Sequence, residues 1–242
     1  PYIDQGWAER LDAADFSEQP ISIAGKAFIA DMTGALYWPS EDALIVADLH
    51  LEKGSAFAAR GQMLPPYDTR ETLARLAAAI DRYDAATVIA LGDSLHDAAA
   101  LDRMDETSRE TLRIMQADRE WIWVTGNHDP SIPHALGGHV RRELVVEGIT
   151  LRHEPKPGRV THEISGHMHP AARIYLHGYS IRRPCFVGNG RRLVVPAFGT
   201  YAGGLNVLDE AFEPLFRNDG MSVWLLGQEG LYPVATRILK ED

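Results

Sequence analysis

Residues 43–50 read Ala-Leu-Ile-Val-Ala-Asp-Leu-His, and this stretch decides the fold. An apolar run without polar interruption is typical of a strand that is buried on both faces, as in a parallel sheet. Asp48 and His50 follow it two residues apart, so in an extended backbone both side chains would point to one side, with Leu49 turned toward the core. The stretch therefore predicts a buried strand that ends in two metal-type ligands.

Two segments further along repeat this pattern of an apolar strand followed by polar residues. Residues 88–91 run into Gly92-Asp93, and residues 121–124 run into Gly126-Asn127-His128-Asp129. Between these strands, apolar residues at helical spacing predict two helices, over residues 68–83 and 107–117. Asp68 and Glu71 are expected to cap the first helix. The alternation of strands and helices indicates an α/β layer with parallel strands.

The second half of the chain is richer in short strands. Four are predicted there, over residues 143–153, 163–165, 172–177 and 191–198, with glycine-containing turns between several of them. They indicate a second, partly antiparallel sheet packed on the first. No linker divides the two halves, so the sequence predicts one domain over residues 1–242.

The second half also carries metal-type ligands after its strands, namely His153 and the run Gly166-His167-Met168-His169. In α/β sheets, sites form in the loops beyond the carboxyl ends of strands, so these segments are expected to meet those of the first half. A glycine directly before a ligand would let the backbone approach that ligand closely. The candidate ligands are Asp48, His50, Asp93, Asn127, His153, His167 and His169.

The donor set consists of carboxylate, imidazole and amide oxygen, without thiolate. Such a set disfavours a structural zinc–cysteine site and suits manganese, iron or zinc. The set is larger than one catalytic ion with open positions requires, which suggests two ions that share a carboxylate. Two cations at about 3.5–4 Å can activate a bridging water and neutralise phosphate oxygens.

The ordered series Asp-x-His, Gly-Asp, Gly-Asn-His-Asp, His and Gly-His-x-His, from Asp48 to His169, resembles the calcineurin-like metallophosphoesterases. The resemblance implies an α/β fold in four layers, with a two-sheet β-sandwich flanked by helices. It implies two divalent ions, manganese in the first place and iron or zinc as alternatives. One ion would be held by Asp48, His50, Asp93 and His169, and the other by Asp93, Asn127, His153 and His167, with Asp93 as the bridge.

The resemblance also implies roles around the ions. A hydroxide bridging the ions would attack phosphorus in line, and His128 would contact the phosphate or protonate the leaving oxygen. Asp129 would orient His128, as suits a general acid. His96 and Arg60 are the candidates for substrate contacts.

Four further tracts resemble one branch of this family, the ligase-associated DNA damage response endonucleases (PdeM): Gly92–Asp97, Arg60–Tyr67, His153–Pro155 and Pro196–Asn206. The branch implies a phosphodiesterase or DNA endonuclease linked to DNA repair, with DNA as the substrate and a DNA ligase and helicase set as partners. A phosphomonoesterase acting on a small metabolite or a phosphoprotein is the enzymatic alternative. A non-catalytic interaction scaffold on the same fold is the alternative from another class.

Composition bears on these alternatives. The net charge of -10 argues against a nonspecific nucleic-acid coat protein, but residues 141–192 carry ten basic and four acidic residues, so this segment is +6 and the remainder -16. The segment is either a solvated face with scattered arginines or a basic rim for an anionic substrate.

Cysteine content and the length of apolar runs indicate where in the cell the protein is expected. The single cysteine, Cys185, excludes an internal disulfide and fits a reducing, cytoplasmic location. The sequence has no apolar run of about 18 residues, and its start, Pro1-Tyr2-Ile3-Asp4, does not resemble a secretory signal. Neither export nor a membrane partner is therefore expected.

Overall fold

The computed structural model describes residues 16–216 and 220–242, so the start Pro1-Tyr2-Ile3-Asp4 lies outside the described residues. A first sheet of seven strands follows the order of the chain. Its strands are β1 (Glu18–Ile23), β2 (Lys26–Asp31), β3 (Leu36–Trp38), β4 (Ala43–Val46), β5 (Thr87–Leu91), β6 (Glu120–Val124) and β7 (His139–Arg141). Strands β1 to β4 pair antiparallel and β4 to β7 pair parallel, which places the carboxyl ends of β4, β5 and β6 at one edge.

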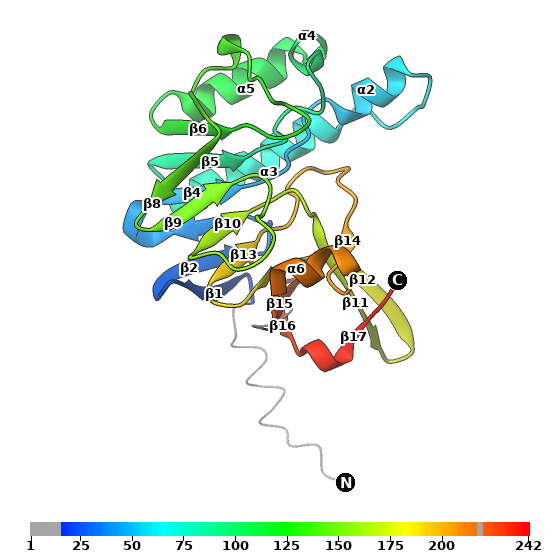
Figure 1. The fold of residues 1–242 in the computed structure, drawn as a ribbon. Coiled ribbons are helices and arrows are strands. Elements are labelled where there is room, and N and C mark those ends of the chain that lie inside the picture. Colours follow the sequence, from blue (N-terminus) through cyan, green and yellow to red (C-terminus); the bar gives the residue numbers. More distant parts are fainter. Residues whose placement is uncertain (1–15, 217–219) are drawn as a thin grey trace.

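Helices α3 (Asp68–Tyr83) and α5 (Glu106–Gln116) cover one face of the first sheet (Figure 1). Leu44 and Val46 of β4 belong to the core on this face, with Leu76 of α3 and Leu112 of α5. Ile45 points the other way, into the core between the two sheets. Because both faces of β4 are buried, its sequence is apolar throughout. Shorter helices are α2 (Lys53–Ala59) and α4 (Ala100–Arg103), and 3-10 turns are η1 (Pro39–Glu41) and η2 (His134–Leu136).

The second sheet has ten strands, with a main order of β14-β11-β12-β13-β10-β9-β8. Strand β15 pairs with β12 and β16, and β17 pairs with β11. The strands are β8 (Glu143–Val146), β9 (Ile149–Arg152), β10 (Glu163–Ser165), β11 (Pro170–Leu176), β12 (Tyr179–Gly188), β13 (Arg192–Val194), β14 (Leu205–Asn206), β15 (Ser222–Leu226), β16 (Leu231–Val234) and β17 (Leu239–Lys240). The pairing is mixed, because β9, β10 and β13 are parallel whereas β8–β9 and β11–β12 are antiparallel hairpins.

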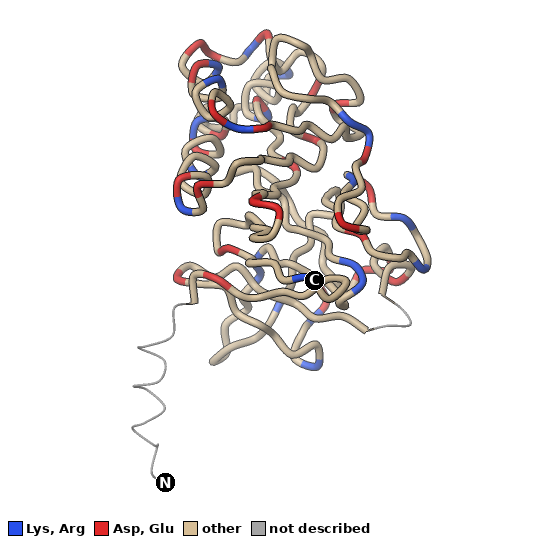
Figure 2. Tube along the Cα trace, turned by 90° about the vertical axis from the view of Figure 1, so that its left-hand side faces the viewer, with Lys and Arg blue, Asp and Glu red and all other residues tan. Residues whose placement is uncertain are grey.

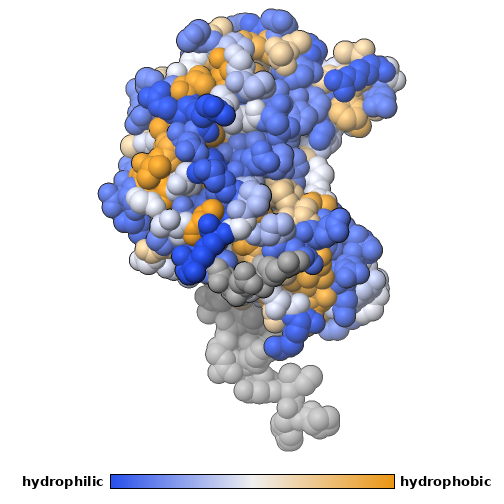
Figure 3. Space-filling view, viewed as in Figure 1, coloured by the Kyte–Doolittle hydropathy of each residue, from blue (hydrophilic) through white to orange (hydrophobic). Residues whose placement is uncertain are grey.

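The two sheets pack face to face, with Ile45 and Val124 of the first against Leu151 and Ile164 of the second. A third core lies behind the second sheet, where η3 (Glu210–Phe212) and α6 (Glu213–Phe216) pack on β12 and β15; η4 (Thr236–Ile238) precedes β17. The predicted two-sheet α/β sandwich flanked by helices is thereby confirmed. The face drawn in Figure 3 is largely hydrophilic, with apolar residues in small separate groups. No helix among the described residues is long and apolar enough to cross a membrane.

The structure differs from the sequence prediction in local detail. The strand predicted over 143–153 is the hairpin β8–β9, because Glu147 and Gly148 both have a positive φ and reverse the chain. The capping pair is wrong: Tyr67 is the N-cap of α3, and the Asp68 carboxylate accepts a hydrogen bond from Gly54 N at 2.9 Å. Asp68 therefore ties α3 to α2 instead of capping its own helix.

Candidate metal centre

The seven candidate ligands follow five strands and meet at one place between the sheets. Asp48 and His50 follow β4, Asp93 follows β5, and Asn127 follows β6. From the second sheet, His153 follows β9, whereas His167 and His169 lie between β10 and β11. Six of the seven fall into two groups whose potential ligand atoms lie within 4.8 Å of one another, Asp48–His50–His169 and Asp93–His153–His167.

The first group brings its potential ligand atoms close together. Nε2 of His50 lies 3.2 Å from Nε2 of His169, which in turn lies 3.3 Å from Oδ1 of Asp48. Oδ2 of Asp48 accepts a hydrogen bond from His167 N at 2.9 Å, but Oδ1 is buried without a hydrogen-bond partner. A buried carboxylate oxygen without a partner is costly unless a cation meets it.

The second group surrounds Nε2 of His153. This nitrogen lies 3.0 Å from Oδ1 of Asn127, 3.1 Å from Nδ1 of His167 and 3.4 Å from Oδ2 of Asp93. Nδ1 of His153 donates to the carbonyl oxygen of Leu91 at 2.8 Å, since that oxygen can only accept. The bond fixes the ring so that Nε2 faces the Asn127 amide oxygen, which places this seventh candidate ligand beside the second group.

Both groups fit a divalent cation. Their donors are carboxylate, imidazole and amide oxygen, the set preferred by first-row divalent ions. Burial and the nearby His169 lower the pKa of His50 to about 3, although Asp48 and Asp93 oppose the shift. His50 is therefore neutral at physiological pH, as a ligand must be. Asp93, a member of the second group, also adjoins the first, because its backbone carbonyl oxygen accepts a hydrogen bond from His50 N at 2.9 Å.

The ligands approach one another because their backbone is left-handed. Positive φ angles occur at Asp48 (54°), His50 (45°), Asp93 (48°), His167 (69°) and His169 (45°). The expectation that Asp48 and His50 share a face of an extended backbone is therefore wrong. A left-handed conformation costs a non-glycine residue about 1–2 kcal/mol, so the surrounding packing must hold these residues in place.

Glycines next to the ligands leave room for close contact. A Cβ on Gly92 would lie 2.5 Å from Nδ1 of His153, and a Cβ on Gly166 would lie 2.6 Å from Oδ2 of Asp48. Neither distance is compatible with a side chain. These two glycines therefore act as the sequence suggested, by letting strand ends from different sheets touch.

His128 lies exposed beside the first group, with its ring centroid 5.1 Å from that of His50. Its Nδ1 donates to the carbonyl oxygen of His96 at 2.9 Å. The expectation that Asp129 orients His128 does not match these contacts. The Asp129 carboxylate is instead buried and accepts backbone hydrogen bonds from Asp93, Ser94, Leu95 and Gly126.

Asp129 thus shapes the turn that carries Asp93. Its carboxylate accepts hydrogen bonds from Asp93 N at 3.0 Å and from Ser94 N at 2.7 Å. The backbone turns sharply there, because the φ of Asp93 is 48°. Backbone donors of this kind have no sequence signature, so the role was not visible in the residue order. The His96 carbonyl was equally invisible, because any residue could supply it.

The candidates for substrate contact differ in position. His96 is buried, and its ring stacks on His128 at 5.3 Å between centroids. Burial lowers the pKa of His96, and the charges of His128, Lys53 and Arg60 lower it further. Arg60 is exposed where α2 ends. Lys53 was missed by the sequence analysis, yet it acts on both His50 and His96.

A third group of nitrogen ligands adjoins the first, formed by His50, His96 and His128. His50 is common to both. The side of the centre near α2 is therefore rich in imidazole, whereas the side near β9 also carries the Asn127 amide.

The structure is similar to that of the Pseudomonas putida nuclease MPE, with a TM-score of 0.71 and 31% sequence identity, covering 90% of this chain and 100% of that chain. Two weaker likenesses are to the protein of unknown function AQ665 from Aquifex aeolicus (TM-score 0.39, 15% identity, 52% and 78% coverage) and to YfcE, a phosphoesterase from E. coli (TM-score 0.41, 15% identity, 80% and 98% coverage). Scores this low do not establish a shared fold. No family model matches the sequence, and no curated protein matches it.

The chain belongs to the calcineurin-like metallophosphoesterases. Within that family, its sequence motifs resemble the ligase-associated branch, and the solved structure that it matches is named a nuclease.

Proposed function

We propose that this chain is a phosphoester hydrolase that cleaves phosphodiester bonds in nucleic acid and depends on two divalent cations. The observation that carries the proposal is the pair of ligand groups around Asp48 and Asp93, whose donor atoms face one another at 3.0–3.4 Å. When bound, such ions supply Lewis-acid activation of water and neutralise the charge of a phosphoryl group. Manganese is the proposed metal.

The ligands divide between the two ions. Asp48, His50 and His169 would hold one ion, and Asn127, His153 and His167 would hold the other. Asp93 would be shared, because it lies beside His153 and also acts on His50. Its carboxylate is ready for this role: despite burial, the hydrogen bond and charge of His153 lower the pKa of Asp93 to about 2.

His128 is the proposed general acid. Its Nδ1 is engaged with the His96 carbonyl, so Nε2 is left for the substrate. The ring is exposed next to His50, where a leaving oxygen can reach it. Protonation of that oxygen by Nε2 would assist departure of the alcohol or nucleotide.

The preference for a diester rests on relationship and charge. The related Pseudomonas putida protein is named a nuclease. A diester also carries one negative charge fewer than a monoester dianion. A link to DNA repair, with a DNA ligase and helicase as partners, is part of this proposal through the branch resemblance alone. A phosphomonoesterase is the outcome that the following experiment separates.

The test uses metal-free protein reloaded with manganese or zinc. Hydrolysis of bis-p-nitrophenyl phosphate, p-nitrophenyl phosphate and an end-labelled oligonucleotide is measured in parallel. We expect manganese-dependent turnover of the diester and of the oligonucleotide, with weaker turnover of the monoester. Turnover of the monoester alone would replace the nuclease with a phosphomonoesterase.

Matched histidine variants connect the activity to the centre. His167→Ala removes a ligand of the second group, whereas His139→Ala removes an exposed histidine on β7. Only His167→Ala should reduce bound metal, measured by elemental analysis, together with turnover. Equal turnover in the two variants would contradict the proposed site.

A further inference from the structure

Helix α3 turns a polar stripe toward the interior of the protein. Figure 2 shows basic and acidic residues interspersed along the chain, so charge alone does not mark a functional face. Burial does mark one: Asp68, Thr69 and Thr72 are at most 5% exposed, on a helix whose apolar residues pack in the core of the first sheet. With the partly exposed Arg75 they follow helical spacing, which places all four on one side of α3.

The polar stripe binds two backbone segments outside its own helix. Its first half, Asp68 and Thr69, accepts hydrogen bonds from backbone amides at the start of α2. Its second half, Thr72 and Arg75, binds residues 198–205, a segment between β13 and the start of β14 that we call the strap. Polar groups are costly inside a core unless they find such partners, so the stripe is buried in order to hold these segments.

The strap is fixed to α3 by two side chains. The Thr72 hydroxyl oxygen accepts a hydrogen bond from Thr200 N at 3.2 Å and lies 3.1 Å from the Thr200 hydroxyl oxygen. The Arg75 guanidinium donates to the carbonyl oxygen of Phe198 and lies over the ring of Phe198, 4.7 Å from its centroid. A planar guanidinium suits both of these contacts. The strap is therefore held by its backbone and by one of its side chains.

The strap also joins two ligands of the first group that come from different sheets. Near its start, Gly199 N donates a hydrogen bond to the carbonyl oxygen of Asp48 at 3.0 Å. At its end, Leu205 N donates to the carbonyl oxygen of His169 at 2.9 Å. The strap therefore runs from the backbone of one ligand to the backbone of the other, and α3 holds it near the Asp48 end.

Gly199 shows how closely the strap lies against the segment after β4. A Cβ on Gly199 would lie 2.4 Å from the carbonyl oxygen of Leu49 and 3.0 Å from that of Asp48. Asp48 and His50, on either side of Leu49, both have positive φ angles. The strap thus packs on the backbone whose left-handed turns present the ligands, and such turns persist only where the surroundings hold them.

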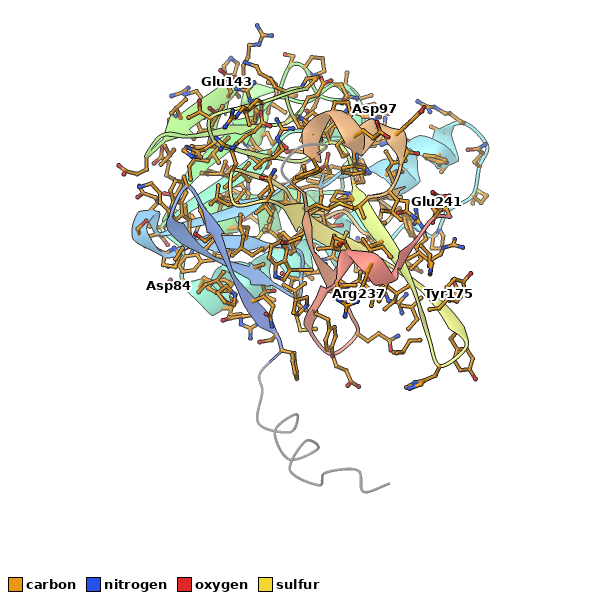
Figure 4. All side chains as sticks on the ribbon, turned by 60° about the horizontal axis from the view of Figure 1, so that its bottom comes forward. Asp84, Asp97, Glu143, Tyr175, Arg237 and Glu241 are labelled. Atoms are coloured by element: carbon orange, nitrogen blue, oxygen red, sulfur yellow. The ribbon has the colours of Figure 1, made fainter. Side chains whose placement is uncertain are left out.

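The second group is fixed by other parts of the molecule. The His153 ring is bonded to a carbonyl oxygen of β5, and the turn of Asp93 is bonded to the Asp129 carboxylate. Within the described part of the chain, no hydrogen bond joins this group to the strap or to the polar stripe. Figure 4 shows Asp84, at the end of α3, well apart from Asp97, which follows the Asp93 turn. Helix α3 therefore leads away from this side of the centre.

We propose that Thr72 and Arg75 are positioning residues for one of the two cations, the first ion. They hold the strap, and the strap holds Asp48 and His169 at the distance at which both can bind that ion. Loss of either contact weakens the first ion and leaves the second ion in place. This inference rests on the two-cation site of the proposed function and adds that α3 sets the affinity for one ion separately.

The first test compares two arginines that make the same type of contact. Arg75→Met removes the guanidinium that holds the strap, whereas Arg109→Met removes a guanidinium of α5 that donates to the carbonyl oxygens of Met104 and Leu101. Metal-free protein is titrated with manganese, and bound metal is counted by equilibrium dialysis with elemental analysis. We expect Arg75→Met to bind one ion about tenfold more weakly, as is typical for residues that orient metal ligands, and the other ion unchanged. Arg109→Met should bind both ions as the wild type does.

Ligand variants identify the ion that is affected. Arg75→Met/His169→Ala should bind manganese as His169→Ala alone does, because both changes act on the first group. Arg75→Met/His167→Ala should bind its remaining ion about tenfold more weakly than His167→Ala alone. The opposite pattern, equal weakening in both backgrounds, or equal weakening in Arg75→Met and Arg109→Met would overturn the inference.

Thr72 offers a conservative pair of changes. Thr72→Val removes the hydroxyl and leaves Thr200 N without its acceptor, whereas Thr72→Ser keeps the hydroxyl. We expect the first ion to bind about tenfold more weakly in Thr72→Val and as tightly as in the wild type in Thr72→Ser. Urea denaturation of each variant gives its unfolding free energy. Manganese affinity that follows the unfolding free energy across all variants, rather than the presence of the hydroxyl, would mean a structural role alone.

Hydrolysis of bis-p-nitrophenyl phosphate by the loaded wild type is followed separately. If the wild type binds two ions but does not hydrolyse the diester, the proposed function fails and the variants still decide the inference. If the wild type hydrolyses the diester and Arg75→Met binds both ions as tightly as the wild type, the proposed function stands and the inference fails.

Discussion

Two buried polar clusters meet at one point of the second sheet, and they are completed in opposite ways. Strand β9 ends at Arg152, which belongs to a network with Glu163 and Arg192, and the next residue, His153, belongs to the metal centre. In the network, the glutamate lies 3.1–3.3 Å from guanidinium nitrogens of opposite charge. In the centre, histidine ring nitrogens face one another.

The difference shows which cluster is structural. The network sets acids against bases of the same chain, with Glu163 beside Arg152 and Arg192 and with Glu143 beside Arg152. The centre gathers facing ligand atoms that fit the proposed cations, and it holds them in left-handed backbone conformations. The following changes test this contrast, starting with the largest expected effect.

Asp93→Ala should disable the centre, because it removes the carboxylate shared by both groups. We expect loss of both metal ions and a fall in diester turnover on the order of 10⁴-fold, since metal activation contributes several kcal/mol to lowering the barrier. Elemental analysis and bis-p-nitrophenyl phosphate kinetics measure the two effects. Asp102→Ala, which removes an exposed carboxylate of α4, is the control. Retention of one fully active ion in Asp93→Ala would remove the bridging role.

Arg192→Met should affect stability instead. The change leaves Glu163 buried beside Arg152 alone and removes the donor to Lys156 and Gly158. Removing one partner of a buried ion pair costs about 3–5 kcal/mol of unfolding free energy. Urea denaturation measures the loss, and Arg192→Met/Glu163→Gln should recover part of it because no buried charge is left unpaired. A cost below about 1 kcal/mol would mean that the network is not a structural element.

His128→Ala separates acid catalysis from metal binding. The ring contacts the His96 carbonyl and lies beside His50, but the ligand groups around Asp48 and Asp93 are complete without it. We expect metal content to stay and turnover to fall about 10²–10³-fold, the range typical of a general acid. A parallel loss of metal would assign His128 to the ligands.

Asp105→Ala is expected to have the smallest effect on stability. Asp105 is exposed, so this variant serves as a comparison for the two buried clusters. Asp105 is the N-cap of α5, and its carboxylate accepts a hydrogen bond from Ser108 N at 3.0 Å. Loss of such a cap costs about 1 kcal/mol. The Ser108 amide lowers the pKa of Asp105, so the stabilisation is present above the ordinary pKa of about 4 and is lost as the pH falls through the lower folded-state pKa.

Thermal unfolding of wild type and Asp105→Ala should therefore differ at pH 7 and converge at low pH. Asp105→Asn keeps an acceptor without a titrating group, so its difference from the alanine variant should persist at low pH. A constant gap between wild type and Asp105→Ala at every pH would show that the carboxylate charge plays no part in the cap.

The sequence predicted most accurately where structure depends on neighbouring residues. The helix over 68–83 is α3 with identical bounds, and the strand over 163–165 is β10. Apolar periodicity reflects the geometry of a few consecutive residues, so it predicts local helices and strands correctly. Strands β1 to β3 were missed, because β1 buries only alternate side chains near its end and contains Pro20, which weakens the pattern of a strand.

The sequence by itself determined the chemistry of the centre: carboxylate, imidazole and amide donors after strand ends, with glycines where strands must touch. Only the tertiary structure decided how these donors meet. His50 and His169 lie 119 positions apart in the chain yet 3.2 Å apart in space, and their left-handed backbone is imposed by packing rather than by residue type. The hydrogen-bond partner of His128 was also decided by long-range contacts, because a hydrogen bond depends on position and leaves no periodic mark in the sequence.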